Sequence, residues 1–187
     1  MEGPRADNRD PPEALRHIEV GELVGEPVAS ADLEDLASLY ADPLIARTLS
    51  RDGRPIPHDH SRRVLEEQLD HWTEHGFGVW VFREPDGRFA GRAGLKAASV
   101  RGEPEVELLY AVTSDRWGRG YATAIANGLV RVAAEGLGLD RLVAFVLPTN
   151  TASRRVLEKC GFEPDGTVVH AGLTHDLMRL ELDRLRS

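Results

Sequence analysis

Apolar residues recur along this chain with two periods, one typical of helices and one typical of strands. A first helix is predicted by apolar residues at positions i, i+3, i+4 and i+7, which are Leu33, Leu36, Ala37 and Tyr40. Ser30 is its expected N-cap, and Asp42-Pro43 is expected to end it. A second is predicted over residues 59–75, where Leu65, Leu69 and Trp72 share one face and Gly76 ends the helix. Between them, residues 42–60 contain three prolines and predict a long loop with a short helical turn at 44–48.

The remaining apolar segments predict strands separated by glycine- and proline-containing turns. We expect extended segments at residues 18–28, 78–83, 88–97, 105–112, 141–147, 163–170 and 174–182. Two further helices are predicted, one after the glycine turn at 117–120 and one from Asn150 to Lys159. This order predicts a mixed α/β fold with helices on both faces of one sheet.

Composition favours a soluble single domain. The chain has 187 residues, 41% hydrophobic and 29% charged, which suits one domain over residues 16–187. Residues 1–15 are polar, contain three prolines and have no apolar period, so they predict a loose N-terminal tail. The sequence has no run of about 18 apolar residues, so no membrane span is expected. It has no apolar core near Met1, so no secretory signal is expected. A net charge of -8 argues against nucleic acid as a partner, and a single cysteine favours the cytoplasm. No histidine spacing predicts a metal site.

A turn at residues 117–123 carries the strongest candidate chemistry. Small residues there stand between a predicted strand and a predicted helix, so unpaired backbone N–H groups could hold a phosphate. An ordinary tight turn is the alternative. A dinucleotide site would need an acidic residue at the end of the next strand, and a nucleotide P-loop would need a lysine followed by Ser or Thr; both are missing.

The motifs together resemble the GNAT-type N-acetyltransferase superfamily and its RimJ/RimL-like branch. The resemblance rests on Glu107-Leu-Leu-Tyr-Ala-Val112, on Trp117-Gly-Arg-Gly-Tyr-Ala-Thr123, and on Asn150, Ser153 and Val156-Leu-Glu-Lys-Cys-Gly-Phe162. It implies a largely antiparallel twisted sheet in which one parallel pair of strands, 105–112 and 141–147, splays apart to admit acetyl-CoA. The residues that the resemblance assigns to the cofactor are Tyr110, Ala111, Val112, Trp117, Gly118, Arg119, Gly120, Tyr121, Ala122, Thr123, Asn150 and Ser153.

Amine acylation requires a base, because an aliphatic ammonium must lose a proton before it attacks a thioester. Strand alternation places Glu105, Glu107 and Leu109 on one face, and Glu107 lies nearest the expected carbonyl site. We therefore predict Glu107 as the base, against the alternative of a solvated carboxylate in an ion pair; Glu105 is the weaker candidate.

The leaving thiolate also calls for a proton donor. Many superfamily members have a tyrosine where this chain has Leu157, so Ser153 is the candidate proton donor, with helix capping as its alternative.

The expected reaction is transfer of an acetyl group from acetyl-CoA to a primary amine, on a protein N-terminus or a small molecule, without a covalent enzyme intermediate. Residues 42–60 and 171–174 are expected to select the acceptor. Alternatives are a non-catalytic acyl-CoA-binding module, a transferase of longer acyl groups, and a nucleotide-binding oxidoreductase. The protein is expected to be a monomer or a homodimer.

Overall fold

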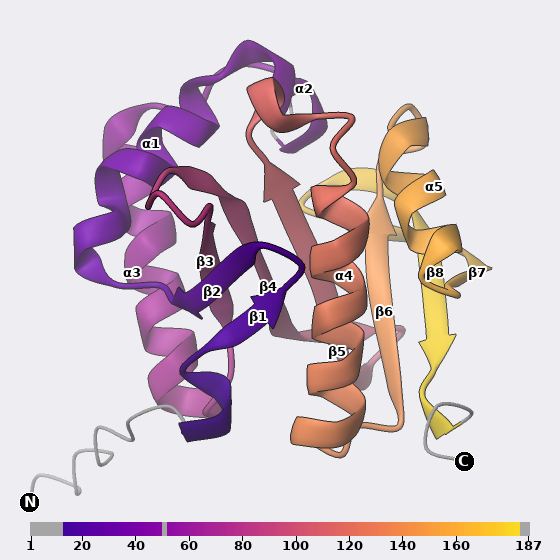
Figure 1. Cartoon of the computed structure of the whole chain (residues 1–187). Helices are drawn as coiled ribbons and strands as arrows, with labels where there is room; N and C mark the ends of the chain where they lie inside the picture. The colour runs from indigo at the N-terminus through magenta and orange to yellow at the C-terminus, as the bar shows by residue number, and fades with distance from the viewer. Residues whose placement is uncertain (1–12, 50–51, 184–187) are drawn as a thin grey trace, which may run out of the picture.

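A computed structural model describes residues 13–49 and 52–183 of the chain. Its centre is one eight-stranded sheet in the order β1-β2-β3-β4-β5-β6-β8-β7, in which every neighbouring pair is antiparallel except β5 and β6 (Figure 1). The strands are β1 (Ile18–Val20), β2 (Leu23–Pro27), β3 (Val79–Arg83), β4 (Phe89–Val100), β5 (Glu103–Val112), β6 (Arg141–Val146), β7 (Glu163–His170) and β8 (Leu173–Glu181).

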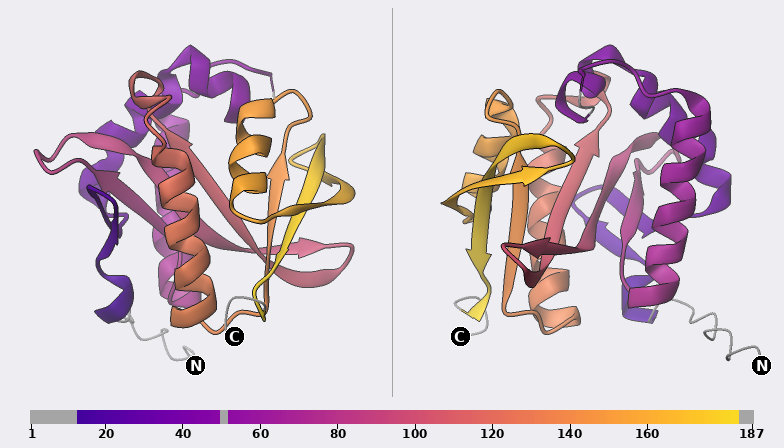
Figure 2. Two further views of the ribbon diagram at one scale, coloured as in Figure 1. Left: turned by 45° about the vertical axis from the view of Figure 1, so that its right-hand side comes forward. Right: turned by 180° about the vertical axis from the view of Figure 1, so that it is seen from behind.

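Helices cover both faces of this sheet, as the sequence pattern predicts. They are α1 (Leu33–Ala41), α2 (Pro43–Leu49), α3 (His58–His75), α4 (Tyr121–Arg131) and α5 (Thr151–Lys159). Helices α4 and α5 lie on the front face of Figure 1, and α1 and α3 lie on the opposite face, as the view from behind shows (Figure 2). A π-helical turn, Val132–Gly136, continues α4. No helix in the described part of the chain has both the length and the apolar character needed to cross a membrane.

The N-terminal part differs from the prediction in two ways. Residues 18–28 form a hairpin rather than one extended segment, because Gly21 takes a left-handed φ of 61° and turns the chain between β1 and β2. The expected tail lies outside the described residues up to residue 12. Its last residues, Glu13–Leu15, form a 3₁₀ turn in which Leu15 is buried and accepts a hydrogen bond from the Trp80 indole (2.8 Å).

The segment around α1 corrects two further expectations. Ser30 does not cap the helix: it begins a 3₁₀ turn, and the carboxylate of Asp32 accepts the backbone N–H of Ala29 (2.8 Å). The helical turn predicted at 44–48 is confirmed and is longer than expected, because residues 43–49 form α2 and shorten the long loop predicted over 42–60. Proline at the first position of α2 explains this, since its fixed φ suits a helix start and its missing N–H costs nothing there.

Strands β5 and β6 diverge, and this divergence makes the functional cleft. They are parallel and pair at Glu107 and Val143. Beyond that pair, residues 108–112 and 144–147 line one cavity instead of pairing. The mixed sheet, its splayed parallel pair and the helices on both faces confirm the predicted fold.

Candidate active site

A cavity of about 1360 Å³ opens between the diverging ends of β5 and β6. It continues across the sheet to α1, α2 and α3, and its wall includes both ends of the predicted site: the glycine turn and Glu107. The predicted site residues that line it are Glu107, Tyr110, Ala111, Val112, Trp117, Gly118, Gly120, Tyr121, Ala122, Thr123, Asn150 and Ser153. The fold therefore brings together residues that lie up to 46 positions apart in the sequence.

The turn before α4 has the geometry that an anion site requires. Gly118 and Gly120 both have φ of 80°, a left-handed conformation that residues with a Cβ adopt at a cost. Gly120 immediately precedes α4, and no other residue lies within 4 Å of the position where its Cβ would be. The first N–H groups of a helix have no partner inside it, so those at the start of α4 are available to a ligand.

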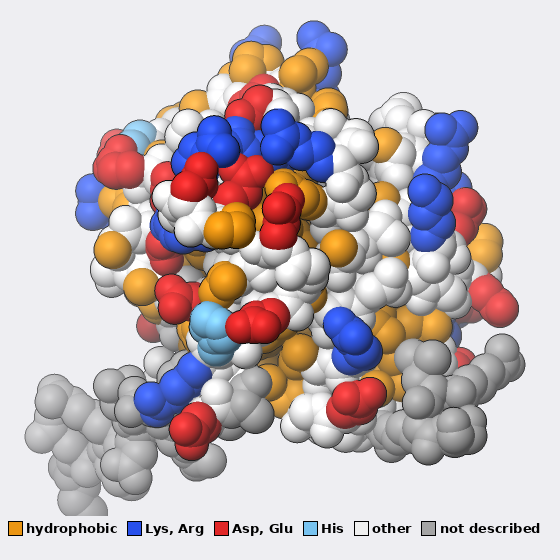
Figure 3. Space-filling model, viewed as in Figure 1, with side chains coloured by type: hydrophobic (Ala, Val, Ile, Leu, Met, Phe, Trp, Pro, Cys, Tyr) orange, Lys and Arg blue, Asp and Glu red, His pale blue; other side chains and the backbone are white. Residues whose placement is uncertain are grey.

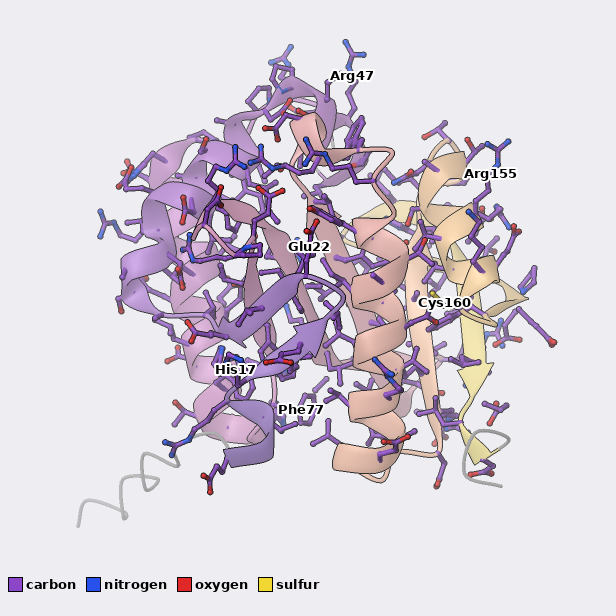
Figure 4. The ribbon with its side chains drawn as sticks, viewed as in Figure 1. His17, Glu22, Arg47, Phe77, Arg155 and Cys160 are labelled. Atoms are coloured by element: carbon purple, nitrogen blue, oxygen red, sulfur yellow. The ribbon has the colours of Figure 1, made fainter. Side chains whose placement is uncertain are left out.

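The buried carboxylate of Glu84 supports the turn before α4, and sequence reasoning did not find it. Glu84 accepts hydrogen bonds from Arg116 (3.0 Å), Arg119 (3.3 Å) and the Tyr121 hydroxyl (3.0 Å). The Arg116 guanidinium, first among these partners, lowers the pKa of Glu84. The Tyr121 hydroxyl shares its one proton between Glu84 and a carboxylate oxygen of Glu22, which lies on the β1–β2 turn (Figure 4). In Figure 3, basic and acidic side chains lie next to one another on this upper part of the surface.

These contacts separate the roles of two predicted cofactor residues. The Arg119 side chain points to Glu84 and does not line the cavity, so its backbone is the part that faces a ligand. Tyr121 is 8% exposed, and its hydrogen bond to Glu22, followed by burial and the bond to Glu84, raises the pKa of its hydroxyl to about 12. Trp117 instead remains 49% exposed, and its indole donates to the Val112 carbonyl (2.9 Å).

Glu107 has the environment of a base. Its side chain is mostly buried, and burial raises the pKa of its carboxyl to about 7, although the charges of Lys96 and Arg92 oppose this rise. Within residues 13–49 and 52–183, Glu107 makes no hydrogen bond and no ion pair through its carboxylate. A carboxyl group with this pKa changes its protonation state near neutral pH, as proton transfer requires.

Glu105, the weaker candidate for the base, has a structural role. It is 7% exposed, and its two carboxylate oxygens accept hydrogen bonds from Arg141 (2.9 Å) and Arg179 (2.8 Å). These ion pairs connect β5 to β6 and β8 below the point where the cleft opens. Two carboxylates on one face of β5 therefore differ in their contacts: Glu105 is in ion pairs, and Glu107 is in none among the described residues.

A family model described as the acetyltransferase (GNAT) domain matches residues 23–163, which include this turn, Glu107 and Ser153. The chain belongs to the GNAT acetyltransferase family. It has relatives among proteins named N-acetyltransferases.

Three relatives illustrate the range of this family. The uncharacterized N-acetyltransferase YoaA of Bacillus subtilis is 34% identical over 81% of this chain and 85% of its own length. The FsC-acetyl coenzyme A-N(2)-transacetylase of Aspergillus fumigatus is 32% identical over 72% of this chain, but the chain spans only 60% of that protein. The structure of Mycobacterium smegmatis RimJ in complex with CoA-disulfide shares the fold, with a TM-score of 0.73 and 21% identity, over 91% of this chain and 88% of that one.

In this GNAT acetyltransferase the cleft is crossed by a hydrogen bond that sequence reasoning missed. The Tyr110 hydroxyl lies 2.9 Å from the Ser153 Oγ and donates to the Ser153 carbonyl (3.1 Å). The prediction used only the backbone of Tyr110. Burial, the main cause, raises the pKa of its hydroxyl to about 12. Asn150 caps α5 by accepting the Ser153 N–H (3.1 Å), so three predicted residues form one connected group.

Leu157 and Cys160 are packing residues. Leu157 is 1% exposed in the main core and also reaches the cavity wall, where many family members have a tyrosine. Cys160 is 8% exposed at the end of α5 (Figure 4), and burial raises the pKa of its thiol to about 11. A thiol with this pKa remains protonated at neutral pH, which agrees with a packing role rather than that of a nucleophile.

Proposed function

We propose that this GNAT acetyltransferase transfers the acetyl group of acetyl-CoA to a primary amine by direct attack. The observation that carries the proposal is Glu107: a free carboxyl with a pKa of about 7, in a cavity that also contains the glycine turn. This arrangement supplies a base on one side of the diverging strands and an anion-binding helix start on the other.

The binding of acetyl-CoA would use backbone groups. The N–H groups of residues 119–123 would bind the pyrophosphate, because glycine at 118 and 120 allows close approach to the chain. The backbone of Tyr110–Val112, which no longer pairs with β6, would bind the pantetheine arm and polarise the thioester carbonyl. Stabilisation of the developing oxyanion by one fixed N–H contributes about 2.7–4 kcal/mol in other enzymes.

Proton movement would begin at Glu107. Its ionised carboxylate would take a proton from the ammonium, directly or through a water molecule, and the neutral nitrogen would then attack the thioester carbon. The new C–N bond forms as the C–S bond breaks, and the sulfur leaves as a thiolate.

Ser153 would stabilise that thiolate by donating a hydrogen bond. Thiols have a pKa near 8.5 and the Tyr110 hydroxyl has one of about 12, so the tyrosine stays neutral and does not protonate the sulfur. The Tyr110 hydroxyl has one proton, which it donates either to the Ser153 carbonyl or to the Ser153 Oγ; in the second arrangement the serine O–H is left free to point at the sulfur. Tyr110 is thus a positioning residue, and the thiolate can take its proton from solvent.

Replacement of Tyr110 by Phe should lower kcat by about three- to tenfold and leave KM for acetyl-CoA nearly unchanged, because only the orientation of the serine is lost. The measurement is steady-state kinetics of Tyr110→Phe, Ser153→Ala and the double variant. If Tyr110 acts through Ser153, the second substitution adds no further loss of kcat. Multiplying effects would show that the two side chains act independently and would contradict the relay.

Release of free thiol from acetyl-CoA over a panel of peptides, polyamines and aminoglycosides tests the proposed reaction directly. At least one amine class should accelerate thiol release by 100-fold or more over the rate without an acceptor, and the product should carry one acetyl group. Calorimetry with acetyl-CoA and with NAD serves as the control. Tight acetyl-CoA binding without thiol release for any amine would favour a binding module, and binding of NAD alone would favour an oxidoreductase.

A further inference from the structure

Arg92 lies in the cavity without a partner of opposite charge. It belongs to β4, where it pairs with Ala111 of β5, and its side chain is mostly buried. Its Nε is fully buried and has no hydrogen-bond partner, and no carboxylate in the described part of the chain lies within 4.0 Å of its guanidinium. A guanidinium is charged at all ordinary pH values, and burial without a counter-ion is costly.

Tyr40 contacts Arg92, and Gln68 contacts Tyr40 in turn. Its guanidinium lies over the ring of Tyr40, with its central carbon 5.7 Å from the ring centroid. The Gln68 amide nitrogen donates to the Tyr40 hydroxyl (3.5 Å), while the Gln68 Oε1 is buried and unpaired. All three residues line the cavity. The Arg92 Nε and the Gln68 Oε1 are thus two buried polar atoms without a partner behind this part of the cavity wall.

This part of the cavity lies on the acceptor side of the sheet. Arg92 faces Tyr40 of α1, and α1 covers the face opposite α4, whose first turn is the expected pyrophosphate site. Arg92 is nevertheless close enough to Glu107 for its charge to lower the pKa of that carboxyl. A group bound by Arg92 would therefore belong to the molecule that delivers its nitrogen to Glu107.

The part of the cavity around Arg92 is more basic than the chain as a whole. The chain carries a net charge of -8, yet the part of the cavity formed by α1–α3, β4 and β5 contains Arg47, Arg92 and Lys96 against Glu67 and Glu107. Arg47 projects from α2 at the top of the molecule (Figure 4). A polycationic amine would meet like charge here, whereas an amine that also carries an anionic group would find a counter-ion.

We propose that Arg92, Gln68 and Tyr40 form a subsite for an oxyanion, a carboxylate or a phosphate, carried by the amine acceptor. The planar guanidinium binds two oxygens side by side, Tyr40 holds the guanidinium plane, and Gln68 holds the Tyr40 hydroxyl. This inference rests on the proposed function, and it narrows the acceptor to amines with an anionic group.

Matched amine pairs test the subsite. Each pair differs in one anionic group: an α-amino acid and its amide, a peptide with a free side-chain carboxylate and its amide, and an aminoalkyl phosphate and the corresponding amino alcohol. In thiol release with acetyl-CoA, the wild-type protein should favour the anionic member of at least one pair by tenfold or more in kcat/KM. The pair that shows this ratio distinguishes carboxylate from phosphate.

Arg92→Gln should reduce that ratio to about one, mainly through a higher KM for the anionic member. Arg92→Lys keeps the charge but loses the two-oxygen geometry, so an intermediate ratio is expected, and it serves as the folded alternative if the glutamine variant is unstable. Arg63→Gln, on the exposed side of α3, is the matched control and should keep the wild-type ratio. The thermal unfolding midpoint of Arg92→Gln shows whether the variant is folded, since it loses the contact between the guanidinium and the Tyr40 ring.

Several outcomes would overturn the subsite. These are equal rates within every pair, an equal loss for both members in Arg92→Gln, or a preference that follows an anionic acyl-CoA such as succinyl-CoA instead of an anionic amine. Absence of thiol release with every amine would count against the proposed reaction instead. In that case calorimetry of the CoA-saturated protein with the same pairs decides the subsite: tighter binding of the anionic member in wild type but not in Arg92→Gln supports it, and equal binding overturns it.

Discussion

Glu107→Gln should lower kcat by about 100-fold or more, since loss of a general base costs between about 10² and 10⁴ in rate. The amide has nearly the shape of the carboxyl but accepts no proton at neutral pH. Wild-type kcat/KM should rise with pH through about pH 7 as Glu107 ionises, and the variant should lack this limb. Steady-state rates between pH 5.5 and 9 provide the measurement, and an unchanged profile would reduce Glu107 to a structural residue.

Stability offers a second, independent readout of the same substitution. The pKa of Glu107 is raised by burial, so the native protein binds more protons than the unfolded chain between about pH 4.5 and pH 7. The free energy of unfolding should therefore fall across this window in the wild type. The Glu107→Gln variant lacks this loss, so at pH 7.5 its free energy of unfolding should exceed that of the wild type by on the order of 1 to 3 kcal/mol. Glu103→Gln, an exposed position on the same strand, should change neither rate nor stability.

Gly120→Val should raise the dissociation constant for acetyl-CoA by at least tenfold while the protein remains folded. Its φ of 80° is unfavourable for a β-branched residue, and the added side chain would occupy the space in front of the first N–H groups of α4. The strain should cost about 1–2 kcal/mol of unfolding free energy. Calorimetry with acetyl-CoA and denaturant unfolding measure the two effects separately.

Gly102→Val is the matched control for this strain. Gly102 lies in the β4–β5 turn with φ of 88°, and no other residue lies within 4 Å of its Cβ position, but it does not line the cavity. Both variants should lose similar stability, and only the change at 120 should lose cofactor affinity. Unchanged acetyl-CoA affinity in a folded Gly120→Val protein would exclude the turn as the pyrophosphate site.

Local pattern was enough to predict the order of most elements and the two ends of the site. Helical and strand periods depend on near neighbours, so α3, β5 and α5 could be read directly. Gly118 and Gly120 could be read as a phosphate turn because the need for a left-handed backbone is a property of the residue itself. The hairpin at Gly21 was missed because a single glycine marks several kinds of turn equally well.

Choice between residues of the same type depended on contacts distant in sequence. Glu105 and Glu107 are two positions apart on one face, yet one is paired with Arg141 and Arg179 and the other is buried without a partner. The Tyr110–Ser153 bond, the support of the turn by Glu84 and the contact of Arg92 with Tyr40 likewise join segments 32 to 52 residues apart.

The sequence by itself determined the fold class, the glycine turn and a short set of candidate residues, because these follow from backbone preference and periodicity along the chain. Only the tertiary structure decided which of Glu105 and Glu107 is free, which hydroxyl orients Ser153, and that the arginine in the cavity wall at position 92 has no ion pair among the described residues. The physical reason is that desolvation and charge pairing depend on distance in space, which the order of residues along a strand does not specify.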